Sequence, residues 1–415
     1  MNVEKDAEVP DGTVVVKQVV KSSTWIKEET KSTCRSQVQR ERYHLQLCEY
    51  SFRIQEDDSN EKYKMTHPLV YSMLQGEATR RKVLEAEGSK QIFYPRSNEG
   101  WWISLRVIEG RALGSIARIW CLVVAHAVVF TCIIQLVGHP LTRTDDALKA
   151  WETLFGIALN GTLSLMLVFR QNRAAARWWT ARERWGLLVA RARTTTSAIL
   201  VHGAHDPAHR DDAIRWLAAY VISVMEFLRG GWDEKEVPPE DLFCGLLRSH
   251  EIDELCQQSH PPLFAGQQIH CALKQLFRVT ADTPAGLSVA RSQQLANLEQ
   301  EFSSLLDQCG AMERIKATPL PIVFVAHLRT FLLLALLLYP YVWGHSWGWG
   351  TVPIVALAGF ALLGIEAASV EVEQPFRRHA VNALNMDGYC IGALGNIQQQ
   401  IRQQADQELA AQRTC

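Results

Sequence analysis

Apolar residues are concentrated in four runs along this chain of 415 residues. The runs lie at about 115–137, 152–169, 322–343 and 351–370, and polar segments separate them. A helix needs about 20 apolar residues to cross the hydrocarbon core of a bilayer, so the second run is only just long enough. The pattern predicts four membrane-spanning helices.

The second run changes character abruptly at Arg170. No charged residue lies between Leu154 and Phe169, whereas arginines recur every few residues from Arg170 to Arg193. A charge at the bilayer centre costs about 2.5–3.5 kcal/mol on insertion scales, so this break marks the depth at which the helix leaves the hydrocarbon. We expect one continuous helix that begins in the membrane and runs on in water to about His202.

The segment between the second and third spans has the apolar spacing of amphipathic helices. Further helices are predicted at 211–229, 241–256, 266–279 and 286–311. A polar tail at 387–415 is also expected to be helical. The fold class is therefore an all-α membrane protein with four transmembrane helices and a large cytosolic helical region.

The first 73 residues mix charged residues, serine and threonine with few apolar clusters. This composition predicts a disordered or loosely docked arm, at 1–73, whose function the sequence does not reveal. The segment Ile92–Arg111 combines tryptophans with basic residues, which suits a membrane surface. An ordinary amphipathic packing helix fits that segment equally well.

Lysine and arginine are unequally shared between the two ends of the spans. They cluster before the first and third spans and after the second and fourth, whereas only Arg143 and Lys149 lie on the other side. This asymmetry places both termini on the cytosolic or stromal side of a multi-pass protein. A plasma membrane and a thylakoid membrane remain equally open. The aromatic residues expected in an interfacial belt are Tyr339, Tyr341, Trp347 and Trp349.

Composition narrows the classes of function. The formal net charge of −1 gives no global field that would favour a nucleic-acid partner. The ten cysteines are scattered without a C-x-x-C pair, so neither a zinc site nor a disulfide framework is expected. No phosphate-binding glycine loop or nucleophile motif stands out, and we therefore expect neither an enzyme nor a cofactor.

Ionisable residues inside a membrane usually face protein or water, because lipid exposure is costly. The residues of this kind are His126, His327, Arg329 and Glu366. They could form an ion path or gate, but a structural pair of Arg329 with Glu366 is favoured. His126 is expected to be a packing histidine.

Gly161, Leu165 and Phe169 lie four residues apart, so they share one face of the second span. In a single helix this is most often ordinary packing. Around a symmetry axis the same stripe would form a narrow apolar ring, which can gate by dewetting. The positive edge of a phenyl ring favours a passing anion. Most of the following arginines suit membrane anchoring and salt bridges, although Arg170 or Arg173 could concentrate anions at the mouth of such a path.

Several short motifs carry a resemblance to a known family. The second span ends in Val-Phe-Arg-x-Asn at 168–172, followed by Arg-Trp-Trp-x-x-Arg at 177–182. Glu-Arg-Ile and Thr-Pro-Leu-Pro lie at 313–321, before the third span, and Glu-Val-Glu-Gln-Pro-Phe lies at 371–376, after the fourth. In this order the motifs resemble those of bestrophin anion channels. The resemblance covers about 92–386 and identifies this range as a channel domain.

The resemblance implies a homopentamer with one ion path along the fivefold axis. Its neck would be lined by Gly161, Leu165 and Phe169, and a cytosolic aperture would lie near Gln293. Glycine at 161 should leave two apolar layers in the neck, and glutamine at 293 should make the aperture polar. The matching structural motif after the fourth span comprises Glu371, Glu373, Pro375 and Phe376.

Arg377, Arg378 and His379 follow Pro-Phe where calcium-gated members of the family have an acidic run. Arginines offer no oxygen ligand to a hard cation, so we expect no metal and no calcium gating. The sequence thus predicts a channel for chloride, and also for bicarbonate or nitrate, with small anions, membrane lipid and its own copies as partners. A proton-coupled transporter that uses Glu366 and His327, or a membrane scaffold without ion flux, remains an alternative.

Overall fold

The computed structural model describes residues 63–88, 113–137 and 156–414, apart from a few positions within these ranges. The chain divides into two compact units at residues 1–71 and 72–415. In the described part of the chain every regular element is a helix, beginning with α3 (Pro68–Gly88). Helix α3 starts within the predicted N-terminal arm. Residues 1–62 of that arm lie outside the described residues. The predicted surface segment 92–111 lies outside them as well.

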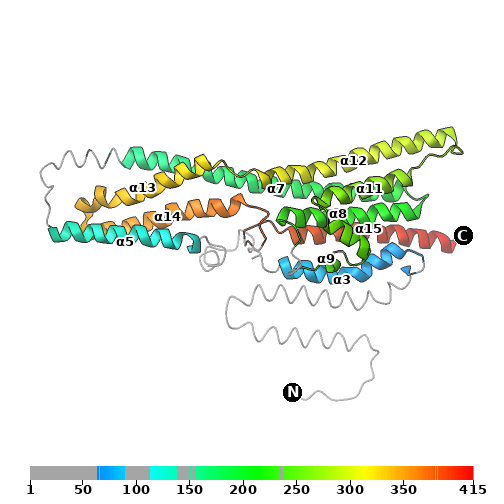
Figure 1. Ribbon diagram of the computed structural model, residues 1–415, viewed down its shortest axis with the longest axis horizontal. Coiled ribbons are helices and arrows are strands. Elements are labelled where there is room, and N and C mark those ends of the chain that lie inside the picture. The colour runs from blue at the N-terminus through cyan, green and yellow to red at the C-terminus, as the bar shows by residue number, and fades with distance from the viewer. Residues whose placement is uncertain are drawn as a thin grey trace, which may run out of the picture. The chain divides into compact units, whose positions relative to one another are not determined.

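Three described helices are long and apolar enough to cross a membrane. They are α5 (Leu113–Val137), α13 (Ile322–Trp347) and α14 (Thr351–Glu373), and a short 3-10 turn at Gly348–Gly350 joins the last two. The helices match the first, third and fourth predicted spans. They lie side by side together with the beginning of α7 (Gly161–His202) (Figure 1). We call this group the membrane bundle.

The second predicted span begins differently in the structure than the sequence predicted. A π-helical turn occupies Gly156–Asn160, and α7 starts only at Gly161. The apolar part of α7 before Arg170 is therefore too short to count as a span by itself, and most of 151–155 lies outside the described residues. The number of four spans stays a prediction. The predicted unbroken helix is confirmed, because α7 runs without interruption to His202.

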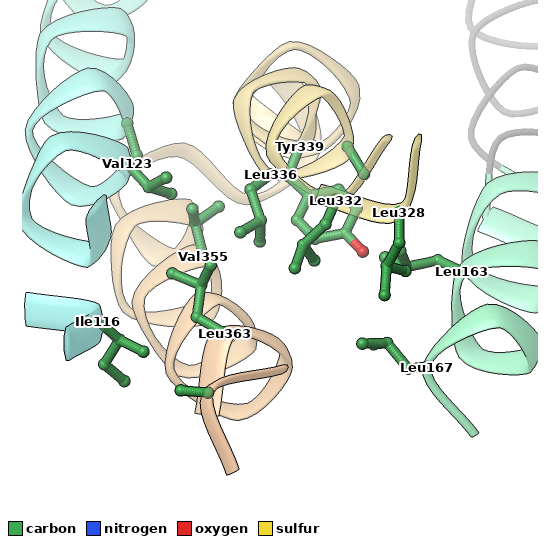
Figure 2. Packing of buried hydrophobic residues seen from close by; sticks show 13 residues of the cluster. Ile116, Val123, Leu163, Leu167, Leu328, Leu332, Leu336, Tyr339, Val355 and Leu363 are labelled. Atoms are coloured by element: carbon green, nitrogen blue, oxygen red, sulfur yellow. The ribbon is translucent and has the colours of Figure 1, made fainter. Parts of the chain in front are cut away.

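The interior of the membrane bundle is apolar. Leu163 and Leu167 of α7 point toward Leu328 and Leu332 of α13, and side chains of α5 and α14 complete the cluster (Figure 2). Trp120 packs against α14 at Gly359, where an added Cβ would lie 3.4 Å from its Cδ1, an ordinary van der Waals distance. Since lipid tails are as apolar as leucine, this packing, rather than water exclusion, holds α7 against the bundle.

A second group of helices forms what we call the helical body (Figure 1). It contains α8 (Pro207–Arg229), α9 (Pro239–Leu242), α10 (Ser249–Cys256), α11 (Pro261–Leu276), α12 (Ala285–Ala317) and α15 (Met386–Thr414). Helices α8, α12 and α15 pack against the later part of α7, and α11 packs against α8. One predicted helix is wrong in part, because 241–256 is divided between α9 and α10. Gly245 lies between them with a φ of 71°, a left-handed conformation that interrupts a helix.

The predicted polar tail is helical but is not merely polar. The buried residues in the first half of α15 include Cys390, Ala393, Leu394, Ile397 and Ile401. They recur at helical spacing, and α15 packs against α7 and α8. This segment is therefore an integral part of the helical body.

Candidate pore-lining helix and its charge cluster

The membrane part of α7 has two different faces. Leu163 and Leu167 are buried in the membrane bundle, whereas Leu165 is 56% exposed and Phe169 is 61% exposed. Gly161 lies on the same outward face, and a Cβ added there would meet nothing within 4 Å. The predicted stripe of Gly161, Leu165 and Phe169 therefore points away from the other described helices of its own chain.

This outward stripe continues beyond the membrane part. The exposed residues that extend it are Asn172, Ala176, Trp179, Glu183, Leu187, Ala190 and Thr194. Each follows the previous one by three or four residues, which is the spacing of one helix face. Within the part of the chain that the structure describes, one face of α7 is thus left uncovered from the bundle far into the helical body.

Arg170, the residue after Phe169, turns to the opposite side of α7 and is only 7% exposed. Its Nη2 lies 2.6 Å from Oε2 of Glu373, and its Nε lies 3.3 Å from Oε2 of Glu366. Glu366 also accepts a hydrogen bond from Nε of Arg329 at 2.9 Å, so the predicted pair of Arg329 with Glu366 is present. The buried, paired state of Arg170 favours a structural role over the anticipated attraction of anions, while Arg173 is exposed.

A second arginine of α7, Arg177, makes contacts next to Arg170 and Glu373. Arg177 donates hydrogen bonds to the backbone oxygens of Ile315, Thr318 and Glu373. The backbone N–H of Leu320 donates to Oε1 of Glu373 at 3.0 Å. We call the set Arg170, Arg177, Arg329, Glu366 and Glu373 the junction cluster. It brings together the sequence motifs that lie after the second span, before the third and after the fourth.

The rest of the motif after the fourth span continues this packing. Phe376 is buried, and the backbone oxygen of Pro375 accepts a hydrogen bond from the N–H of Leu384 at 2.8 Å. Glu371 is partly exposed. These contacts fix the chain where it leaves α14 and turns toward α15.

The predicted aperture residue Gln293 lies on α12 and is exposed. Its Nε2 donates a hydrogen bond to Oδ1 of Asn297, one turn further along, at 3.3 Å. Helix α12 packs along α7. An ion pair between Arg191 and Glu301, with an N–O distance of 3.0 Å, helps to hold the two helices together.

Other polar groups of the membrane bundle have structural partners. The Nε2 of His126 lies 3.2 Å from the backbone oxygen of Leu337, as expected of a packing histidine. Tyr339 is buried and its hydroxyl group bonds to Oδ1 of Asn160, so its expected place in an interfacial belt is wrong. Tyr341, by contrast, is 49% exposed.

A second cluster of charges lies in the helical body and was not predicted from the sequence. It comprises Glu226, Arg229, Arg378 and Asp387, which we call the C-terminal cluster. Arg378 donates to the Glu226 carboxylate, and Nη1 of Arg229 lies 2.8 Å from Oδ1 of Asp387. Burial raises the pKa of Glu226 above its ordinary value, although the two arginines lower it. The three-residue spacing of Glu226 and Arg229 was the only signal in the sequence.

The arginines after Phe376 therefore differ in their surroundings. Arg377 is exposed, whereas Arg378 belongs to the C-terminal cluster. Among the residues that the structure describes, no group of three or more histidine, cysteine, aspartate or glutamate side chains could hold a metal ion.

Comparisons with known proteins agree with this arrangement. A family model described as Bacterial/Fungal Bestrophin protein matches residues 91–399. A voltage-dependent anion channel-forming protein of Nostoc sp. is 31% identical over 57% of this chain and 73% of its own length. A chloroplastic voltage-dependent chloride channel of Arabidopsis thaliana is 25% identical over 56% of this chain and 52% of its own length.

The fold is also similar to that of solved structures. The crystal structure of a bacterial bestrophin homologue from Klebsiella pneumoniae aligns with a TM-score of 0.57 and 22% identity. The alignment covers 69% of this chain and 98% of that one. The order of the motifs, the helical fold and the match of the family model over most of the chain lead to one conclusion: this membrane protein belongs to the bestrophin family.

Proposed function

We propose that this protein is a pentameric channel for small monovalent anions, chloride foremost, and that it needs no calcium to open. The observation that carries the proposal is the outward turn of Leu165 and Phe169, opposite to the buried Leu163 and Leu167. An outward apolar stripe of this kind could line a symmetry axis that several copies of the chain surround. The names of relatives in Nostoc sp. and Arabidopsis thaliana, which describe anion and chloride channels, support the same function.

The neck of this channel would have two apolar layers. Gly161 contributes no side chain, so Leu165 and Phe169 form the constriction in each copy. Anions would lose part of their hydration there, and the positive edges of the phenyl rings would favour them over cations. A ring this apolar can also close by dewetting. Arg173 is exposed one turn beyond Phe169 and would raise the local anion concentration.

The cytosolic aperture would be polar. Gln293 lies on the exposed side of α12, and its hydrogen bond to Asn297 orients its amide group. Amide groups can both donate to an anion and accept from water. We therefore expect this aperture to pass hydrated anions, bicarbonate and nitrate included.

Calcium independence is supported by the surroundings of Arg378. A calcium ion takes several oxygen ligands, whereas this segment supplies two arginines, one of which is bound to the Glu226 carboxylate. The channel domain would occupy about 92–386, preceded by the arm. Both termini would lie on the cytosolic or stromal side of a plasma or thylakoid membrane, since basic residues are concentrated at that end of the spans.

The arrangement of Glu366 disfavours a proton-coupled transporter. Its two carboxylate oxygens each accept from an arginine, Arg170 or Arg329, so this carboxylate is engaged in structural ion pairs on both sides. His327 lies on the exposed side of α13. A scaffold without ion flux gains no support from any described contact.

Reversal potentials of the purified protein in planar bilayers under a chloride gradient test the proposal. We expect a potential close to the chloride equilibrium value and discrete single-channel events. A cation-like potential, or saturable flux without such events, would overturn the proposal.

The neck assignment has its own test, in the double variant Leu165→Ala, Phe169→Ala. Removing both apolar layers should raise the single-channel conductance and weaken gating, because a wider and wetter constriction holds a water column more easily. Leu122→Ala is a matched control, since Leu122 is similarly exposed on α5. Unchanged currents in the double variant would contradict the assignment.

A further inference from the structure

Arg329 is an exposed charge inside a candidate membrane span. It lies seven residues after the start of the span Ile322–Gly344, about 10 Å along the helix at 1.5 Å per residue. Its side chain is 52% exposed in the single chain. A guanidinium group that faced lipid at this depth would be costly.

Arg329 does not lower this cost by extending its side chain to the membrane surface. Long basic side chains often extend toward the membrane surface and keep their charge in water. The Nε of Arg329 is instead held 2.9 Å from Oε1 of Glu366, which is itself buried and bound to Arg170. The charge is therefore fixed at the level of the junction cluster.

The surface around Arg329 is built for contact with another helix. Ala326 and Thr330 lie one turn apart on α13 and are both exposed. Small residues at this spacing allow helices in membranes to approach closely. Leu334, one turn further on, is 50% exposed. A face with polar, small and apolar residues within three turns fits a protein surface better than a water-filled path.

The other two candidate spans lack such a face. In the middle of α5 the exposed residues are Ile119, Cys121, Leu122, Ala125, Val128, Val129 and Ile133. In α14 they are Pro353, Leu357, Phe360, Ala361, Ile365 and Ala368. Both lists are apolar or weakly polar throughout, as expected of lipid-facing surfaces. Arg118 of α5 is exposed as well, but it lies only four residues after the start of the span Gly114–Leu136, so among the described spans α13 exposes the more deeply placed charge.

We propose that the face of α13 formed by Ala326, Arg329, Thr330 and Leu334 is where a second copy of this chain packs within the membrane. The inference rests on the proposed assembly and assigns one of its contact surfaces. The second copy covers the pair of Arg329 with Glu366 and removes it from lipid. Because Glu366 also binds Arg170, next to Phe169, the same contact reaches the neck of the first copy.

Site-specific photocrosslinking of the full chain in membranes tests this inference. A benzophenone amino acid at position 330 should move the protein into bands of two or more copies after irradiation. The same group at position 357, on the exposed side of α14, is the control and should leave the protein in the single-copy band. A third variant with the group at position 165 reports on the assembly itself.

The outcomes separate the inference from the proposed function. Products between copies from position 330 but not from 357 support the contact. Products from position 165 without any from 330 overturn it while the assembly stands. If none of the three positions gives a product and the particle has the mass of one chain, the proposed assembly fails and this inference fails with it.

A substitution provides a second measurement. Arg329→Met retains an unbranched apolar stem but removes the charge. At a contact between copies, the change should lower the fraction of assembled particles in detergent. If position 329 faced lipid, the same change would remove a costly charge, and an unchanged or larger assembled fraction would overturn the inference.

Discussion

Two clusters of charged side chains with buried ion pairs at their centres join segments that are far apart along the chain. The junction cluster ties α7 to α13 and α14, and the C-terminal cluster ties α8 to the segment before α15. Removing one partner of a buried ion pair typically costs about 3–5 kcal/mol, because the other charge is left without compensation. Single arginines in these clusters should therefore matter more for stability than the many arginines on the surface.

Arg378 and Arg377 form a matched pair for a test of this point. Arg378→Ala leaves Glu226 with the more distant Arg229 only, so the free energy of unfolding should fall by about 3–5 kcal/mol. Arg377→Ala removes an exposed charge and should change it by no more than about 0.5 kcal/mol. Thermal unfolding in detergent compares the two variants. Equal effects would mean that the C-terminal cluster contributes nothing specific.

Glu251 gives a prediction about pH. Burial raises the pKa of this carboxyl. Hydrogen bonds from Arg215 and from the N–H of Arg248 lower the pKa by more than burial raises it, so the folded-state pKa lies below the ordinary value. The ionised group therefore contributes stability above that ordinary value, and the contribution is lost as the pH falls through the lowered folded-state pKa.

The comparison of wild type with Glu251→Gln isolates this contribution. The variant should be less stable by about 1.5–3 kcal/mol at neutral pH, as for hydrogen bonds to charged groups. The difference should shrink in acid, once the wild-type carboxyl is protonated as well. Chemical unfolding over a range of pH measures it, and a difference that stays constant into acid would refute the pKa argument.

At the scale of helices, α7 determines most of the arrangement. Its apolar spacing and its arginines predicted a helix that continues from the membrane to His202, and they predicted which residues share the outward stripe. The π-helical turn before Gly161 was not predicted; it ends at Asn160, whose side chain accepts a hydrogen bond from Tyr339, a tertiary contact that the sequence pattern does not reveal. The break at Gly245 was also missed, since an isolated glycine within a helical pattern is often tolerated.

Tyr339→Phe tests whether the start of α7 depends on that contact. The change removes only the hydroxyl group that bonds to Asn160, and in membranes such hydrogen bonds are worth about 0.6 kcal/mol on average. We expect a small loss of thermal stability together with altered gating, because the turn precedes the stripe of Leu165 and Phe169. Tyr341→Phe, at a more exposed tyrosine, is the control. Identical behaviour of both variants would show that the contact does not position α7.

At the scale of the whole molecule, motifs separated by more than a hundred residues meet at the junction cluster, where Arg177 binds the backbone at Thr318 and Glu373. The sequence contained these motifs in order, but of the junction cluster itself only the pair of Arg329 with Glu366 was predicted. The burial of Arg170 could not be predicted, because an arginine at the end of an apolar run can be either buried in an ion pair or exposed to solvent. Only the packing of α14 against α7 decides between the two.

Because Arg170 is buried and Arg173 is exposed, Arg173 is the charge that we propose for the mouth of the ion path. If five copies surround one axis, Arg173→Gln removes five positive charges near the neck, and the single-channel conductance should fall by roughly half or more when salt is dilute. At about 1 M salt the Debye length is only about 3 Å, so the conductance of the variant should approach that of the wild type. Arg118→Gln, at an exposed position on α5 away from the stripe, should leave the conductance unchanged at both salt concentrations. A loss that does not depend on salt would mean that Arg173 shapes the neck through packing and not through its charge.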